Sequence, residues 1–115
     1  MLLDGAPLRK YGHHGFPHMR HVYLSPDLRF VLWRAPGTSP AKNHKDGIAV
    51  SDITDVLDGP TTAIFATNAG WFRHADCCFS LVSAGRTLDL EAATVAEKTE
   101  WVLAFLCLKR YRSTI

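Results

Sequence analysis

The sequence predicts an all-β domain that is closed by one C-terminal helix. Two observations lead to this fold class. Residues 94–112 carry a long helical pattern, and the chain before them consists of short apolar and β-branched runs separated by turn residues. A helix with one apolar stripe, placed after a series of short strands, fits over the end of an open β-barrel or sandwich.

The helical segment has a clear start and a clear buried face. Thr94 and Glu97 have the spacing of a capping box, in which the threonine hydroxyl accepts from the backbone N–H three residues later. Four apolar residues then recur at i, i+3, i+4 and i+7 on one stripe: Trp101, Ala104, Phe105 and Leu108. We expect this stripe to pack against the strands.

Seven short strands are expected before the helix, bounded by Gly, Pro, Ser and Asp. They are Leu8–Tyr11, His18–Ser25, Arg29–Ala35, residues 48–56 with a break or a bulge near Ser51-Asp52, Thr61–Ala66, Cys78–Val82 and Arg86–Glu91. In the last of these strands, the period of two places Leu88 and Leu90 inward. The same alternation predicts that Asp89 and Glu91 face outward.

The composition sets limits on the class of protein. A chain of 115 residues is one domain, and 13 basic against 11 acidic residues gives no strong preference for a charged partner. No apolar run approaches the length that spans a bilayer. Three cysteines are a poor disulfide framework and indicate a reducing, cytoplasmic compartment. Because the strands begin almost at Met1, we expect residues 1–115 to be a single domain of a larger multidomain protein.

Several motifs then follow one another in a characteristic order. They are Leu8-Arg9-Lys10-Tyr11-Gly12, Arg20 through Ser25, Leu32-Trp33, Asp52-Ile53 with Val56, Gly59 through Phe65, Phe79-Ser80-Leu81, Arg86 through Leu90, and Trp101. In this order the chain resembles a pleckstrin homology (PH) domain over essentially its whole length. It is most similar to the subtype of plant RCC1-repeat/FYVE proteins and to phospholipase C-like PH domains. The resemblance implies two nearly orthogonal, antiparallel sheets that form a seven-stranded barrel or sandwich, with one corner capped by the helix.

The resemblance also implies a phosphoinositide site at the open end, between the first two strands. Lys10 and Arg20 match the basic positions of binding members of the family, and inward-facing residues of both strands point into the mouth there. Their cationic groups can hold phosphates by charge-assisted hydrogen bonds. The other candidate phosphoinositide-binding residues are His18, Arg9, His13 and His14.

The histidines are the main departure from the family pattern, because binding members carry lysine or arginine at several of these positions. A free imidazole with a reference pKa near 6.5 is mostly uncharged at neutral pH, so the binding is expected to be weak. Three interpretations remain open: a pH-dependent anion site, a metal site, or solvated loop histidines. A zinc site is disfavoured because ligands on one loop lack a second cluster. We therefore expect no metal.

Five residues are candidates for contact with a membrane or a protein partner: Phe16, Trp71, Phe72, Leu103 and Cys107. Phe16 lies at a loop tip, where it either inserts into a bilayer or packs on the barrel rim. Trp71 and Phe72 either cover the barrel end or form a contact patch. Leu103 and Cys107 fall on the helix face opposite Trp101, where they either dock a second copy or another domain, or are covered by neighbouring basic side chains.

Two functions remain after the motifs are compared with known chemistries. No catalytic constellation or cofactor motif is present, so we expect neither enzymatic activity nor a cofactor, and the balanced charge disfavours nucleic acid. The first hypothesis is a peripheral membrane-targeting and signalling module that binds phosphoinositides or acidic membrane surfaces weakly. The alternative is a protein-protein interaction module that binds no specific lipid.

Overall fold

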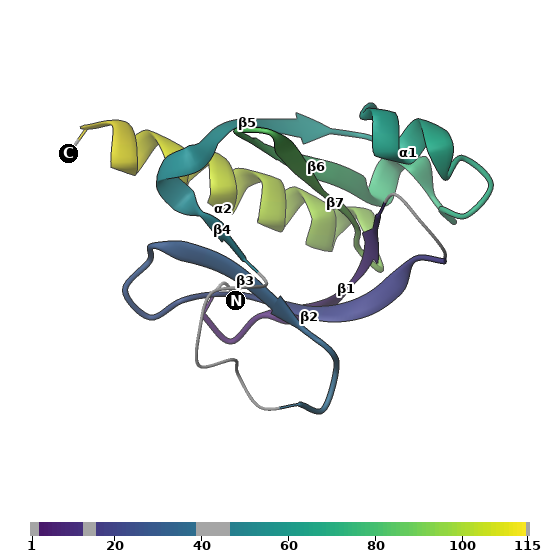
Figure 1. Cartoon of the computed structure of the whole chain (residues 1–115), viewed down its shortest axis with the longest axis horizontal. Coiled ribbons are helices and arrows are strands. Elements are labelled where there is room, and N and C mark those ends of the chain that lie inside the picture. The colour runs from purple at the N-terminus through teal and green to yellow at the C-terminus, as the bar shows by residue number, and fades with distance from the viewer. Residues whose placement is uncertain (1–2, 13–15, 39–46, 115) are drawn as a thin grey trace.

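The computed structural model describes residues 3–12, 16–38 and 47–114, with side chains described up to residue 111. Seven strands are present: β1 (Ala6–Tyr11), β2 (His18–Leu24), β3 (Phe30–Arg34), β4 (Gly47–Ala49), β5 (Ile53–Asp58), β6 (Cys78–Ser83) and β7 (Arg86–Glu91). All the pairings are antiparallel, in the order β4-β3-β2-β1-β7-β6-β5 (Figure 1). The predicted fold class, a seven-stranded antiparallel sheet with one C-terminal helix, is confirmed.

The two halves of the sheet are joined through β1. Its residues Arg9, Lys10 and Tyr11 pair with Glu91, Leu90 and Asp89 of β7, while residues 6–10 pair with β2. The strands therefore form one continuous ladder, and the expected two layers are the halves β4-β3-β2-β1 and β7-β6-β5 of that ladder. The inward-facing side chains of both halves make a single apolar core.

The C-terminal helix α2 (Val95–Thr114) packs on β5, β6 and the turn before β5, so that it covers one end of this bent sheet (Figure 1). The hydroxyl of Thr94 accepts from Glu97 N at 3.1 Å, as the capping-box spacing predicts. Trp101 is fully buried, and its ring stacks on that of Phe105 with centroids 5.6 Å apart. Burial of each such side chain contributes about 1.5–3 kcal/mol, so the stripe fixes the helix on the core.

The predicted strand at Thr61–Ala66 is wrong. These residues begin a short helix, α1 (Ala63–Thr67), whose first turn is capped by Thr62: its hydroxyl oxygen accepts from Phe65 N at 3.3 Å. The same hydroxyl donates to the buried carboxylate of Asp89 at 2.5 Å. A threonine that satisfies both groups favours a helix start, and this outweighs the β propensity of the following apolar residues.

The break near Ser51-Asp52 is complete rather than a bulge within one strand. A single 3-10 turn, η1 (Val50–Asp52), separates β4 from β5, and Val50 N donates to Arg29 O at 2.8 Å. At this turn the chain passes from one half of the sheet to the other. Within the described residues the number of strands is still seven, as expected. The predicted fourth strand is divided into β4 and β5, and the predicted strand at Thr61–Ala66 forms α1 instead.

Asp89 and Glu91 were expected to face solvent, and this is also wrong, because both are buried. The outer face of β7 is covered by α1 and the segment that follows it, where Tyr11, Phe65 and Cys78 form a second small cluster. The Asp89 carboxylate accepts from three hydroxyls at 2.5–2.7 Å, those of Thr62, Ser80 and Thr87. A buried carboxylate is tolerated here because its oxygens are satisfied.

Candidate functional site: a cationic mouth beside β1 and β2

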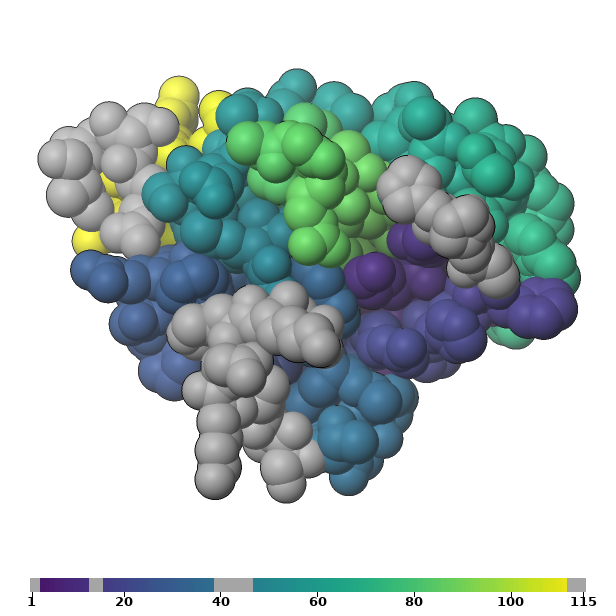
Figure 2. Space-filling model, in the orientation of Figure 1, coloured from purple at the N-terminus to yellow at the C-terminus, as the bar shows by residue number. Residues whose placement is uncertain are grey.

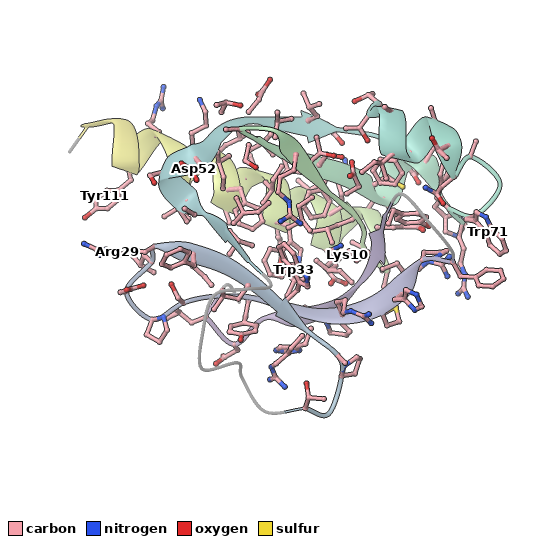
Figure 3. The ribbon with its side chains drawn as sticks, viewed as in Figure 1. Lys10, Arg29, Trp33, Asp52, Trp71 and Tyr111 are labelled. Atoms are coloured by element: carbon pink, nitrogen blue, oxygen red, sulfur yellow. The ribbon has the colours of Figure 1, made fainter. Side chains whose placement is uncertain are left out.

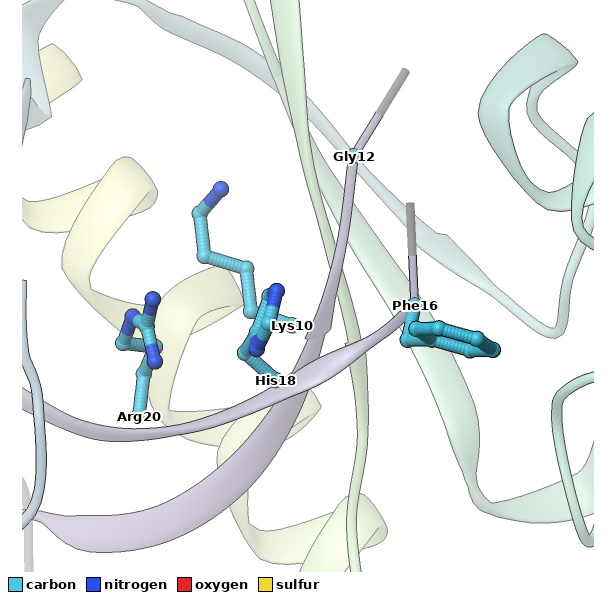
Figure 4. Close-up of a pocket in the computed structure, with 5 residues that line it drawn as sticks. All are labelled: Lys10, Gly12, Phe16, His18 and Arg20. Atoms are coloured by element: carbon cyan, nitrogen blue, oxygen red, sulfur yellow. The ribbon is translucent and has the colours of Figure 1, made fainter. Parts of the chain in front are cut away.

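Three basic side chains from two paired strands point into one cavity at the open side of the sheet. Lys10 of β1 lies opposite His18 of β2, and Arg20 lies opposite Leu8, so all three share the inward parity of the apolar residues. Together with Gly12 and Phe16 they line a cavity of about 180 Å³ (Figure 4). This volume is smaller than that of pockets that enclose drug-sized ligands, so it suits a charged group bound at the surface.

Trp33 forms an aromatic platform beside this cavity, and it carries two cations. The Nζ atom of Lys10 lies 5.1 Å from the centroid of the Trp33 ring, and the Cζ atom of Arg86 lies 5.2 Å from it. Figure 3 shows Lys10 next to Trp33 in the middle of the sheet. Both contacts are within the range of cation–π attraction. One indole ring, only 7% exposed, therefore holds two like charges near each other.

The two arginines of this mouth differ from Arg9, which lies against the carboxylate of Glu91. Within the described residues, neither Arg20 nor Arg86 forms an ion pair with a carboxylate. Arg20 donates from Nη1 to the carbonyl oxygen of Met19 at 2.8 Å, which fixes its direction and leaves other N–H donors of the guanidinium available. We call the set Lys10, His18, Arg20, Trp33 and Arg86 the cationic mouth.

Arg9, a sequence candidate for the same site, lies on the opposite face of β1. Its Nη2 donates to Trp71 O at 2.9 Å, and its Nε lies 3.4 Å from Glu91 Oε1. It lines a separate cavity of about 240 Å³ whose wall includes the buried Glu91. Adjacent residues of a strand face opposite sides, so Arg9 and Lys10 cannot serve one pocket.

Glu91 organises that opposite face. Its carboxylate accepts from the Tyr11 hydroxyl at 2.6 Å and from the backbone N–H groups of Arg73 and His74 at 2.9 Å. Burial, followed by this hydrogen bond, raises the pKa of Tyr11 far above its ordinary value. The carboxylate thus anchors the segment after α1 to the sheet.

Cys77, just before β6, and Cys78, at its first position, show no sign of an activated thiolate. Burial raises the pKa of Cys78 to about 12, and burial also raises the pKa of Cys77. Both thiols are therefore protonated at neutral pH and act as small apolar groups. Cys107 is exposed on α2.

The other sequence candidates are distributed over several surfaces. His13 and His14 lie outside the described residues, so the histidine cluster is represented at the mouth by His18 alone within the described chain. His21 faces away, with its Nε2 atom 2.7 Å from Asp4 O. In the part of the chain that the structure describes, no three His, Cys, Asp or Glu side chains gather in a way that could hold a metal ion.

The aromatic candidates separate into an exposed pair and a packed residue. Phe16 is 63% and Trp71 46% exposed, and their rings meet edge to face with centroids 4.7 Å apart. Phe72 instead packs against Phe65 at 6.0 Å in the second cluster. Leu103 lies on the open face of α2 and is 57% exposed.

The sequence analysis missed Trp33 and Arg86 as members of the site. The signal for Arg86 was its parity, since it shares a face with the inward Leu88 and Leu90. The position of Trp33 opposite Val22 gives the same signal on β3. Strand parity does not show how closely the side chains of β7, β1 and β3 approach one another across the sheet.

Comparison with solved structures places this fold among PH domains. The PH domain from TgAPH superposes with a TM-score of 0.68 at 18% identity, covering 97% of this chain and 87% of that one. The N-terminal PH domain of human ARAP2 gives 0.68 at 17% identity, with coverage of 95% and 80%. The C-terminal PH domain of human pleckstrin gives 0.67 at 21% identity, with coverage of 96% and 81%. The chain therefore has a PH-like fold.

Matches at the level of sequence are lacking. No protein-family model matches the sequence, and no curated protein matches it. Among the helices of the described chain, none is long and apolar enough to span a lipid bilayer.

Proposed function

We propose that this domain is a non-catalytic targeting module that binds phosphate-bearing headgroups, of phosphoinositides or inositol phosphates, at the cationic mouth. The observation that carries the proposal is the position of Lys10, which lines one cavity with Arg20 and shares the ring of Trp33 with Arg86. Neither arginine is neutralised by a carboxylate among the described residues. Phosphate oxygens satisfy such donors by charge-assisted hydrogen bonds, and a planar guanidinium can bind two of them at once.

The shape of the mouth supports weak, peripheral binding. The cavity of about 180 Å³ is open, and His18 stands where another permanent cation would strengthen binding. A module of this kind would act in the cytoplasm at the surface of an acidic membrane. The motifs that resemble PH domains of plant RCC1-repeat/FYVE and phospholipase C-like proteins, together with the PH-like fold, support this class of function.

The proposal is tested by titrating the domain with a soluble inositol bisphosphate and with vesicles that contain a phosphatidylinositol bisphosphate. Lys10→Glu and Arg20→Glu should each abolish measurable binding in both titrations. Arg29→Glu is the matched control, because Arg29 is an exposed cation at the other end of the sheet (Figure 3). If the two mouth variants bind like the control, the cationic mouth is not a phosphate site.

His18 adds an imidazole to this mouth. It faces Lys10 across the β1–β2 pair and lines the cavity with Arg20. A His18→Gln variant that binds both probes like the wild type would exclude a role for this imidazole in the site.

A second candidate function, protein docking, rests on the open face of α2. Leu103 and Leu106 are 57% and 42% exposed there, next to the exposed Cys107. If this face joins two copies, sedimentation should show a dimer under reducing conditions that Leu103→Glu dissociates. A monomer at all concentrations would exclude self-association through this face.

A further inference from the structure

Two exposed aromatic rings from distant parts of the chain form a pair at the edge of the cationic mouth. Phe16 comes just before β2, and Trp71 comes from the segment between α1 and β6. Their rings meet at an interplanar angle of 90° with centroids 4.7 Å apart, although 63% of Phe16 and 46% of Trp71 stay exposed. In Figures 1 and 2 the start of β2 and the segment after α1 lie side by side at the same end of the molecule.

The backbone of Trp71 is held by hydrogen bonds on both sides. Trp71 O accepts from Arg9 Nη2 at 2.9 Å, and Trp71 N donates to Asn68 O at 2.9 Å. Asn68 in turn donates from Nδ2 to Gly12 O at 3.1 Å, which ties this segment to the end of β1. Because the backbone is fixed from both sides, the indole is held in the open and does not fold back onto the core.

The aromatic pair and the cations belong to one rim. Phe16 lines the same cavity as Lys10, His18 and Arg20, while its ring points away from these three side chains (Figure 4). The surface therefore presents positive charge and, directly beside it, rigid apolar rings. An anionic bilayer surface offers the complementary pair of environments, phosphates in the headgroup layer and apolar material just beneath.

We propose that Phe16 and Trp71 insert into the interfacial layer of an anionic bilayer while the cationic mouth holds a headgroup. This inference rests on the proposed function and names the source of the phosphate: a lipid within a membrane. A free inositol phosphate would use only the cations and would leave both rings in water. Aromatic side chains are favoured at the membrane–water interface, where ring and headgroup layer meet. Phe72 takes no part, because it packs against Phe65.

The first test uses Trp71 as its own reporter. Trp33 is 7% exposed and Trp101 is fully buried, so Trp71 is the tryptophan in position to meet acyl chains. Phosphatidylcholine vesicles with a phosphatidylinositol bisphosphate and brominated chains should quench the emission of the bound wild-type domain. Trp71→Phe keeps an aromatic ring and should bind the same vesicles with that quenching lost. Binding without quenching of the wild type would overturn the inference.

The second test separates the membrane from the headgroup. Phe16→Ser should weaken vesicle binding by about 10-fold, the scale expected when burial of one large apolar side chain is lost. Its affinity for a soluble inositol bisphosphate should stay within about 2-fold of the wild type. Leu28→Ser, at an exposed apolar residue in the turn between β2 and β3, is the matched control and should change neither affinity.

The outcomes distinguish this inference from the proposed function. If Phe16→Ser lowers vesicle and soluble-headgroup binding equally, the ring shapes the cavity and does not insert. If it changes neither, and bromines do not quench Trp71, the pair has another partner and the headgroup site stands alone. If the wild type binds neither probe, the proposed function fails and the inference fails with it.

Discussion

Arg86 gives the sharpest test of the cationic mouth, because the sequence pattern alone did not select it. In Arg86→Gln the side chain stays polar but becomes shorter and loses its charge, next to the ring that also contacts Lys10. Arg86 is exposed, so its interaction with a phosphate is screened by water. One charge pair at about 4 Å is worth about 1 kcal/mol in water and about 4 kcal/mol near a protein surface, and an exposed group belongs near the lower figure.

We therefore expect Arg86→Gln to weaken bisphosphate binding by about 5- to 10-fold, which corresponds to about 1–1.4 kcal/mol. Isothermal titration at two salt concentrations measures this loss, and the salt dependence of binding should become shallower because one cation is gone. Arg29→Gln is the control. Thermal melting should show both variants folded.

The double variant Lys10→Gln/Arg86→Gln adds a second criterion. Two cations that share one aromatic platform and one ligand should give a combined loss that differs from the sum of the single losses. If Arg86→Gln binds as tightly as Arg29→Gln, and the double variant equals Lys10→Gln, then Arg86 does not take part and the mouth contains only the β1 and β2 cations.

Three further predictions concern stability. Tyr11→Phe removes the hydroxyl donor to the buried Glu91 and should lower the free energy of unfolding by about 1.5–3 kcal/mol in urea; a loss under about 0.5 kcal/mol would mean that the bond contributes nothing. Thr62→Val removes the cap of α1 and should cost about 1–2 kcal/mol, with hydrogen exchange accelerated in residues 63–67; unchanged exchange would contradict the capping role. Burial raises the pKa of Cys78 from 9.0 to about 12. Above pH 9 the thiol therefore ionises in the unfolded chain while it stays protonated in the folded one. The free energy of unfolding should then fall as the pH rises, by up to ~1.4 kcal/mol per pH unit. Cys78→Ala should flatten that fall between pH 9 and about 10, and an equally steep profile in the variant would exclude the thiol as its cause.

The elements that the sequence predicted correctly are those whose signals are local. The capping pair Thr94 and Glu97 and the stripe from Trp101 to Leu108 lie within one segment, and the structure has both features. Similarly, β1, β2, β6 and β7 lie where their own apolar residues and the flanking turn residues predict them. The position of each of these strands along the chain follows from local signals, although the burial of both faces of β7 does not.

The errors occur where distant groups decide the structure. The choice of helix at α1 depends on the Asp89 carboxylate, which accepts from the capping Thr62. The burial of Glu91 depends on the N–H groups of Arg73 and His74, which come from a segment without a strong pattern. Neither partner can be identified from spacing along the sequence.

For the candidate site, strand parity placed Lys10 and Arg20 toward one cavity, and the structure has them together with His18. Strand parity already puts Arg9 and Lys10 on opposite faces of β1, yet both were named as candidates for the same site. The structure separates them, since Arg9 is engaged by Glu91 and Trp71 O on the other side of β1. Phosphate binding at the cationic mouth is our proposal, and the titrations described above test it.

The central position of β1 in the sheet has a consequence for how the domain acquires its structure. Among the strands of this domain β1 is made before β7, so one of its edges stays unpaired until β7 follows, and the bond from Tyr11 to Glu91 spans 80 positions of the chain. Such long-range closure makes folding slow and cooperative. Before closure, β1 and β2 present an open hydrogen-bonding edge, which is a site for aggregation of nascent or truncated chains. The two halves of the sheet therefore cannot mature as independent folding units.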